Sequence, residues 1–244
     1  MENKIKNLSD FLGVESGIIF AADLPALSSL EEILKSIGKN NKLVALKVGF
    51  SLALRYGLPV IASKIRKFSN LPIIYDHQKA ATDIPSMGKP FANICKDSGI
   101  ESVILFPQAG PVTLRAFVEA LFDNSLIPIV GTTMTHRSYL AAEGGYISNE
   151  APNKIIEHSI ELGVRNFVLP ATKPNLISHY IDEYLQKIAP TSIIAPGIGS
   201  QGASIKSTSI ATKGHHFFPV IGSAIYKSKD PEKALEFFTE EMEQ

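Results

Sequence analysis

Eight short apolar runs, each followed by an interval long enough for a helix, constrain the fold of this chain more than any other feature. The runs are rich in Val, Ile and Phe and are apolar along nearly their whole length. Strands of this kind have both faces covered, as in parallel sheets. They span residues 18–23, 43–49, 72–76, 102–106, 127–131, 166–170, 192–195 and 217–221.

The intervals carry helical periodicity. Apolar residues recur every three or four positions behind Pro111, and a second stripe of this kind runs from Leu176 to Ile188. Ser28 and Glu31 have the spacing of a capping box. Eight strand–helix units in 244 residues favour a closed (β/α)₈ TIM barrel over a doubly wound open sheet. We therefore expect one α/β barrel domain over residues 1–244.

Charge and cysteine content narrow the function classes. Lys plus Arg (24) equals Asp plus Glu (24), so no global charge favours nucleic acid or an anionic membrane as a partner. The single cysteine, Cys95, cannot form an internal disulfide. No apolar run reaches the ~18–20 residues that span a bilayer, and the polar first residues do not resemble a secretory signal. We expect a cytoplasmic enzyme.

Charged residues follow the first three strands. Asp23 ends the first, Lys47 interrupts the second, and Asp76, Lys79 and Asp83 follow the third. In an α/β barrel the carboxyl ends of the strands form one mouth, where the chemistry occurs. A lysine within an apolar strand needs a carboxylate partner. The sequence therefore predicts an alternating network of acids and lysines at the mouth.

Glycine-rich turns follow the last two strands. The segment APGIGSQGA, with Pro196 and Gln201, follows the seventh, and Gly222-Ser223 follows the eighth. Turns at these positions hold phosphate groups in barrels, because backbone N–H groups point at the anion. Neither a dinucleotide fingerprint nor a P-loop motif is present in the sequence.

The long polar segment after the fifth strand, GTTMTHRSYLAAEGGYIS, suits a loop that covers a substrate. It offers Thr135 and His136 as donors, although a single histidine is a weak catalytic signal. No residue spacing resembles a zinc site, and no serine lies in a nucleophile elbow. We expect no metal site.

Seven segments together resemble the orotidine 5′-phosphate decarboxylase family, in the family's order and from Asp23 to Tyr226. They are AADL, KVG, YDHQKAATDIP, TMTH, VLPATKP, PGIGSQG and IGSAIY. Two departures stand out. The Asp76–Lys79–Asp83 signature is two residues longer than the family pattern, so either its loop bulges to keep the three charges in register or the roles of these residues have moved. Ser223 stands where the family has a phosphate-binding Arg, so phosphate binding depends on a neutral hydroxyl unless Lys173 or another cation substitutes.

The resemblance implies conversion of orotidine 5′-phosphate to UMP and CO₂ in pyrimidine biosynthesis, without a cofactor. Lys79 would stabilise the carbanion and donate the proton, beside Asp76. Asp83 would reach the partner's site in a homodimer. The resemblance implies substrate-binding roles for Asp23, Lys47, Thr135, Pro196, Gln201, Gly222 and Ser223.

Two alternatives remain open from the sequence. Mg²⁺-dependent hexulose-6-phosphate synthases and keto-gulonate phosphate decarboxylases share the third-strand signature, but carry a metal-binding Glu where this chain has Lys47. A cation there would repel Mg²⁺. The second alternative is a non-catalytic barrel that binds a nucleotide.

Overall fold

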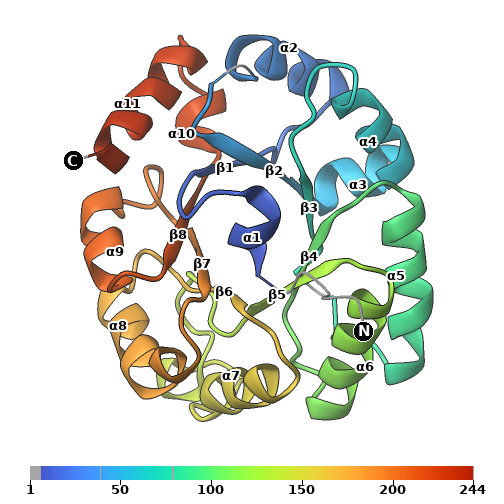
Figure 1. The fold of residues 1–244 in the computed structure, drawn as a ribbon, viewed down its shortest axis with the longest axis vertical. Coiled ribbons are helices and arrows are strands. Elements are labelled where there is room, and N and C mark those ends of the chain that lie inside the picture. The colour runs from blue at the N-terminus through green and yellow to red at the C-terminus, as the bar shows by residue number, and fades with distance from the viewer. Residues whose placement is uncertain (1–6, 39, 79, 244) are drawn as a thin grey trace.

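The protein is a closed barrel of eight parallel strands in sequence order, seen here in a computed structural model that describes residues 7–38, 40–78 and 80–243 (Figure 1). The strands are β1 Ile18–Ala21, β2 Leu43–Gly49, β3 Ile73–Asp76, β4 Ser102–Leu105, β5 Ile127–Gly131, β6 Asn166–Val168, β7 Ser192–Pro196 and β8 His216–Ile221. Pairing of β1 with β8, with Ile19 opposite Val220, closes the ring. The expected α/β barrel is confirmed, and each strand ends within two residues of its predicted limits.

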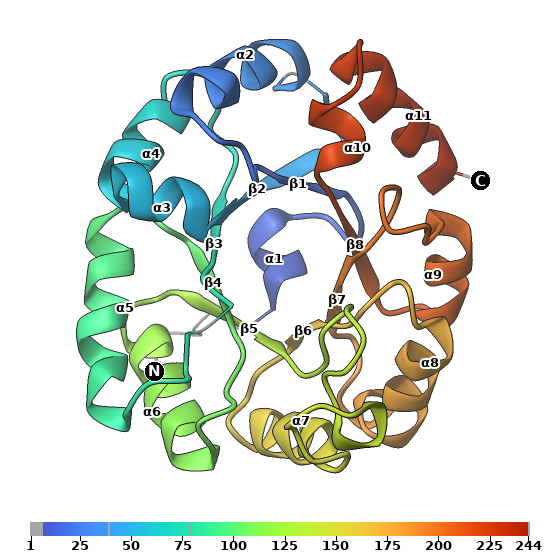
Figure 2. The ribbon, with the colours of Figure 1, turned by 180° about the vertical axis from the view of Figure 1, so that it is seen from behind.

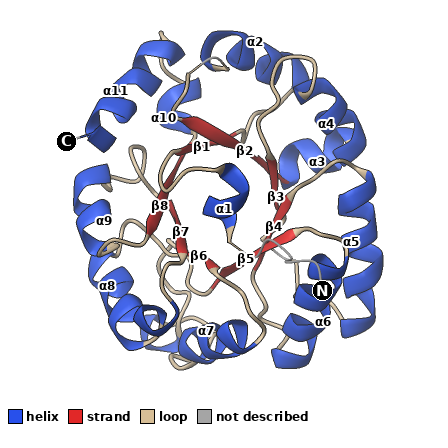
Figure 3. Cartoon of the chain, in the orientation of Figure 1, coloured by secondary structure: helices blue, strands red, loops and turns tan. Residues whose placement is uncertain are grey.

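The long helices surround the barrel on its outside, whereas α1 lies within the ring of strands (Figure 3). The helices, with 3₁₀ turns labelled η, are α1 Leu8–Leu12, α2 Leu27–Ile37, α3 Phe50–Tyr56, α4 Leu58–Ile65, η1 Pro85–Met87, α5 Gly88–Asp97, α6 Pro111–Asp123, η2 Ala141–Glu143, α7 Ala151–Glu161, α8 Pro174–Glu183, η3 Leu185–Ile188, α9 Ile205–Ala211, α10 Ser223–Tyr226 and α11 Pro231–Glu243. None of the described helices is long and apolar enough to cross a membrane.

Two helix predictions were wrong in detail. Ser28 does not cap α2, because the extended residue Ala26 already precedes the first helical position and Ser28 lies inside the first turn. The stripe that ends at Ile188 is not one helix. Tyr184 leaves helical geometry (φ −123°, ψ −50°), so α8 ends at Glu183 and a 3₁₀ turn continues the apolar face.

Alternate residues of the strands build two apolar layers. Ile18 and Phe20 of β1 pack outward against the helices, whereas Ile19 and Ala21 face the interior of the barrel. This alternation explains why the strands are apolar throughout. It also decides which side chains at the strand ends can face the mouth.

Helix α1 lies at the centre of the barrel in views from both sides (Figure 2). Leu8 is fully buried in the interior layer, and its N–H donates to Asn166 Oδ1 at 2.7 Å. Asn166 begins β6 and also donates to Pro128 O at 3.0 Å. Contacts with the first residues of strands place α1 at the amino end of the barrel, opposite the expected site. No sequence pattern predicted this helix.

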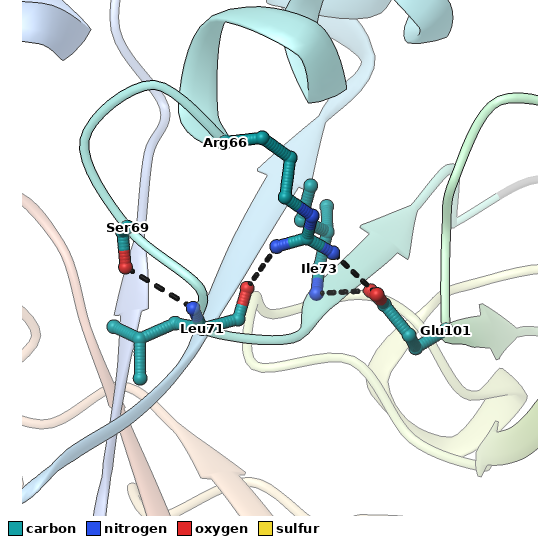
Figure 4. Close-up of polar contacts among 5 residues, drawn as sticks. All are labelled: Arg66, Ser69, Leu71, Ile73 and Glu101. Carbon is teal, nitrogen blue, oxygen red and sulfur yellow. Dashed lines mark hydrogen bonds and ion pairs between the residues drawn. The ribbon is translucent and has the colours of Figure 1, made fainter.

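A second polar cluster joins the starts of β3 and β4 (Figure 4). The Glu101 carboxylate accepts from Ile73 N at 2.7 Å and pairs with Arg66, whose other nitrogen donates to Leu71 O at 2.6 Å. Ser69 Oγ accepts from Leu71 N at 3.1 Å. This cluster ties the loop before β3 to the residue before β4. Its position at the amino end assigns it to stability.

Candidate active site

A cavity of about 240 Å³ opens at the carboxyl ends of the strands. Its charged side is formed by Asp23, Lys47 and Asp76, from the ends of the first three strands. The other sides are formed by the loops after β5, β7 and β8. The structure thus brings together, around one cavity, most of the residues that the sequence analysis selected.

Lys47 is the centre of the charged side. Its Nζ lies 2.7 Å from Asp76 Oδ2 and 3.7 Å from Asp23 Oδ2. Burial alone would lower the pKa of Lys47, but the charges of Asp76 and Asp23 and their hydrogen bonds outweigh it, so the pKa is raised above the ordinary lysine value. The ammonium therefore stays charged. The prediction that Lys47 has carboxylate partners is confirmed.

Gly49 explains how Asp23 reaches this site. Asp23 lies two residues beyond the end of β1, with its side chain half exposed. A Cβ at Gly49 would stand 2.7 Å from Asp23 Oδ1, so a side chain there would require the carboxylate to move from its present position. The glycine of the KVG segment is therefore the residue that admits the carboxylate.

The loop after β3 contains two left-handed residues, Gln78 (φ 50°) and Ala81 (φ 65°). Such residues turn the chain sharply, which is the expected bulge. Gln78 N donates to Asp76 Oδ1 at 3.2 Å, and Phe106 N donates to Ala80 O at 3.0 Å. Lys79, the predicted catalytic lysine, lies outside the described residues.

Asp83 does not line the cavity of its own chain. Its side chain is exposed, and Oδ1 accepts from Ile84 N at 2.7 Å. The predicted role of Asp83 in a partner's site therefore involves no contact with the cavity described here.

The loops after β7 and β8 form the end of the cavity where we expected phosphate. Pro196, Gln201, Gly222 and Ser223 all line it. A Cβ on Gly222 would lie 3.0 Å from Ala21 O, a tight contact that favours glycine here. Among the lining residues that the structure describes, Lys47 is the one cation, and it lies on the charged side.

Lys173 does not line the cavity. Its Nζ pairs with Glu143 at 3.3 Å, a contact that holds the loop after β5 against the start of α8. In this structure Lys173 therefore does not take the place of the missing arginine.

The loop after β5 covers one side of the cavity with Thr133, Met134 and Thr135, whereas His136 is exposed and does not line it. Buried Tyr139 anchors the loop. Its hydroxyl donates to Thr132 O at 3.3 Å and accepts from Gln108 Nε2 at 3.1 Å.

Sequence reasoning missed the apolar wall of the cavity, formed by inward-facing strand positions such as Ile104, Phe106 and Ile194. The Phe106 ring fills the place where a Cβ on Gly131 would lie, at 2.2 Å. Gln78 and Tyr226 also line the cavity and were missed. The alternation of inward and outward positions along each strand could have predicted the apolar wall of the cavity. The two additional residues in the Asp76–Asp83 signature could have pointed to Gln78.

The described residues include no group of three or more His, Cys, Asp or Glu side chains placed to hold a metal ion. Lys47 occupies the space between the two carboxylates that face each other across the charged side. The cavity thus presents a buried cation and two carboxylates on one side and an apolar wall on the other.

The fold and the site together define a (β/α)₈ barrel protein with a lysine–carboxylate site at its mouth. The family model described as "Orotidine 5'-phosphate decarboxylase / HUMPS family" matches residues 16–238. The chain belongs to this family. The family resemblance inferred from the seven segments is therefore confirmed.

Curated relatives extend the match over almost the whole chain. "Orotidine 5'-phosphate decarboxylase" of Thermoplasma acidophilum is 30% identical over 228 residues, which cover 93% of this chain and 96% of the relative. The protein of the same name from Methanosarcina barkeri is 29% identical over 230 residues, which cover 94% and 96%.

Solved structures agree with the fold. Orotidine 5'-phosphate decarboxylase from Pyrococcus horikoshii superposes with a TM-score of 0.76 at 25% identity, covering 93% of this chain and 99% of that one. The Methanocaldococcus jannaschii enzyme complexed with the inhibitor BMP has a TM-score of 0.79 at 23% identity, covering 94% and 99%.

Proposed function

We propose that this chain converts orotidine 5′-phosphate to UMP and CO₂, a step of pyrimidine biosynthesis. The observation that carries the proposal is the buried Lys47–Asp76 pair at the mouth of the barrel, 2.7 Å between Nζ and Oδ2, with Lys79 three residues beyond Asp76. Membership of the family supports this assignment. The names of the curated relatives support it over the Mg²⁺-dependent alternative, as does the cation at Lys47.

The chemistry needs a cation beside the carbon that loses CO₂. The bond from pyrimidine C6 to the carboxylate breaks, and its electron pair stays on C6. The Lys79 ammonium stabilises this charge and then transfers a proton to C6, after which solvent returns a proton to the amine. Asp76 lies beside the departing carboxylate and orients the lysine. Exclusion of water strengthens these electrostatic effects.

The remaining predicted site residues bind the substrate. Asp23 and Lys47 hold ribose hydroxyls, Thr135 pairs with the ring, and Pro196, Gln201, Gly222 and Ser223 surround the phosphate. Binding of the distant phosphate supplies energy that orders the loop over the ring. No cofactor takes part in this scheme.

The assay for this proposal follows the loss of orotidine absorbance and the release of CO₂ by the purified chain. We expect turnover by the wild type and loss of turnover in Asp76→Asn. Binding of UMP without any turnover would instead assign the chain to the non-catalytic nucleotide-binding barrels. Turnover that a chelator abolishes would support the Mg²⁺-dependent alternative.

The phosphate end permits a gain-of-function test. A neutral hydroxyl makes one hydrogen bond to phosphate, whereas a guanidinium makes a charge-assisted bidentate pair. If Ser223 contacts the phosphate, Ser223→Arg lowers KM, and added salt weakens this gain. Ser223→Gln, long but uncharged, is the matched control. An unchanged KM in both variants would remove Ser223 from the phosphate site.

We also propose a homodimer with shared sites. Asp83 is exposed beside apolar Ile84 and Met87, whose side chains are also exposed, and this surface suits contact with a second copy of the chain. The test mixes inactive Asp83→Ala and Lys79→Ala proteins. Hybrid dimers with one intact site should recover part of the activity, whereas no recovery after verified subunit exchange would contradict sharing.

We place the enzyme in the cytoplasm. Cys95 is a free, buried thiol, which suits a reducing compartment. Cell fractionation with an antibody to the chain tests this location.

A further inference from the structure

Two side chains near the end of β3, those of Tyr75 and His77, lie on the outer side of the strand, away from the cavity. Ile74 and Asp76 face the interior, whereas Ile73 and Tyr75 belong to the outer apolar layer. His77 continues on the side of Tyr75, and the two rings meet edge to face, with centroids 5.5 Å apart and an interplanar angle of 74°. Tyr75 and His77, the residues before and after Asp76, therefore contact each other on the side of the strand opposite the cavity.

Tyr75 is firmly held at this position. It is 5% exposed, and its ring stacks on Phe91 of α5 with centroids 6.4 Å apart. Burial, with smaller contributions from Cys95 and Asp76, raises the pKa of Tyr75 to about 12. The phenol is therefore protonated at neutral pH. The Tyr75 hydroxyl and His77 Nδ1 share a hydrogen bond.

The chain turns into strained geometry immediately after His77. Gln78 and Ala81 are left-handed, a conformation that is unfavourable for residues other than glycine. Asp76 uses Oδ1 to hold Gln78 N and Oδ2 to hold Lys47. A shift of the loop would therefore move the same carboxylate that orients the buried lysine.

We infer that the Tyr75–His77 contact, on the outside of the barrel, fixes the start of the widened loop and so positions Asp76 and its partner Gln78. Tyr75 and His77 are positioning residues, because neither lines the cavity. The inference rests on the proposed decarboxylase function for its kinetic consequence. It explains how a signature with two additional residues is held in place.

The kinetic test removes each side of the hydrogen bond in turn. Tyr75→Phe deletes the phenol hydroxyl, and His77→Leu deletes the imidazole nitrogen that contacts it. We expect each to lower kcat about tenfold with KM within twofold, and the double variant to be no worse than either single variant. His77→Asn keeps an acceptor near the place of Nδ1 and should recover most of kcat. Tyr56→Phe, on α3, is the control and should match the wild type.

A second measurement does not need activity. In Tyr75→Phe, hydrogen exchange at Gln78 N and Phe106 N, the amides bonded to Asp76 and Ala80, should accelerate at least tenfold. Wild-type exchange at these amides in Tyr75→Phe would overturn the inference, and so would unchanged kcat in both Tyr75→Phe and His77→Leu. A His77→Asn variant as slow as His77→Leu would overturn it too. An inactive wild type would contradict only the proposed function. The hydrogen-exchange rates would still test the positioning role of the Tyr75–His77 contact.

Discussion

The ammonium of Lys47 lies 2.7 Å from Asp76 Oδ2, so an ion pair joins the ends of β2 and β3 inside the mouth of the barrel. Both side chains are nearly buried, with 10% and 6% of their surfaces exposed. Removal of one partner from such a pair leaves a buried charge uncompensated. The pair therefore couples the stability of the barrel to its chemistry.

We predict that Asp76→Asn lowers the free energy of unfolding by about 3–5 kcal/mol and kcat by about 10³-fold. Asp23→Asn is the matched control, since Asp23 pairs with the same lysine but is half exposed. It should cost at most about 1 kcal/mol. Denaturant unfolding and steady-state kinetics measure the two effects. Equal stability losses in the two variants would contradict the importance of burial.

The cluster in Figure 4 should affect stability without affecting catalysis, because it lies at the amino end of the barrel. Glu101→Gln weakens the pairing with Arg66 and should cost about 1–2 kcal/mol of unfolding free energy. Glu119→Gln, in an exposed helical pair with Arg115, should cost under about 0.5 kcal/mol. We expect unchanged kcat in both. A large loss of kcat in Glu101→Gln, measured on folded protein, would contradict this separation.

Asn166 fastens α1 in the amino end of the barrel. Asn166→Ala leaves Leu8 N and Pro128 O without their present partner, which should cost about 2–4 kcal/mol. Asn124→Ala, which removes a more exposed amide from Ala120 O and Asn93, should have a much smaller effect. Thermal and denaturant unfolding compare the two variants. Equal losses of unfolding free energy would contradict a stabilising role for α1 at the amino end of the barrel.

Cys95 gives a pH-dependent prediction. Burial raises the pKa of its thiol from 9.0 to about 12, so the folded protein keeps the proton that the unfolded chain loses above pH 9. Stability from this group is fully present below pH 9 and is lost as the pH rises toward 12. Between these limits the unfolding free energy should fall less steeply in Cys95→Ala than in the wild type. Identical slopes would contradict the shift. At neutral pH a thiol reagent should modify Cys95 after unfolding.

Much of the fold was predictable because parallel strands buried on both faces leave continuous apolar runs, as β2 and β5 do. The helix α1 was not predictable, because its five residues carry too little periodicity to distinguish a plug from a loop. Its place depends on Asn166, which is distant in sequence. The split of the stripe at Tyr184 likewise depends on backbone geometry that apolar spacing does not encode.

The site was predictable where charge interrupts an apolar pattern. Lys47 within β2 required a carboxylate, and the acids after neighbouring strands were the available partners. The Tyr75–His77 contact was not predictable, because nothing in the sequence states which side of the strand His77 takes after the bulge. The engagement of Lys173 with Glu143 depends on how the loop after β5 folds back, which is also a tertiary property.

We propose that the amine of Lys79 stabilises and protonates the carbon that loses CO₂. The most direct test measures single-turnover decarboxylation of orotidine 5′-phosphate by Lys79→Ala, with UMP binding measured by calorimetry on the same protein. We expect loss of turnover by at least about 10³-fold, with the fold intact and UMP still bound. Turnover near the wild-type rate in this variant would contradict it.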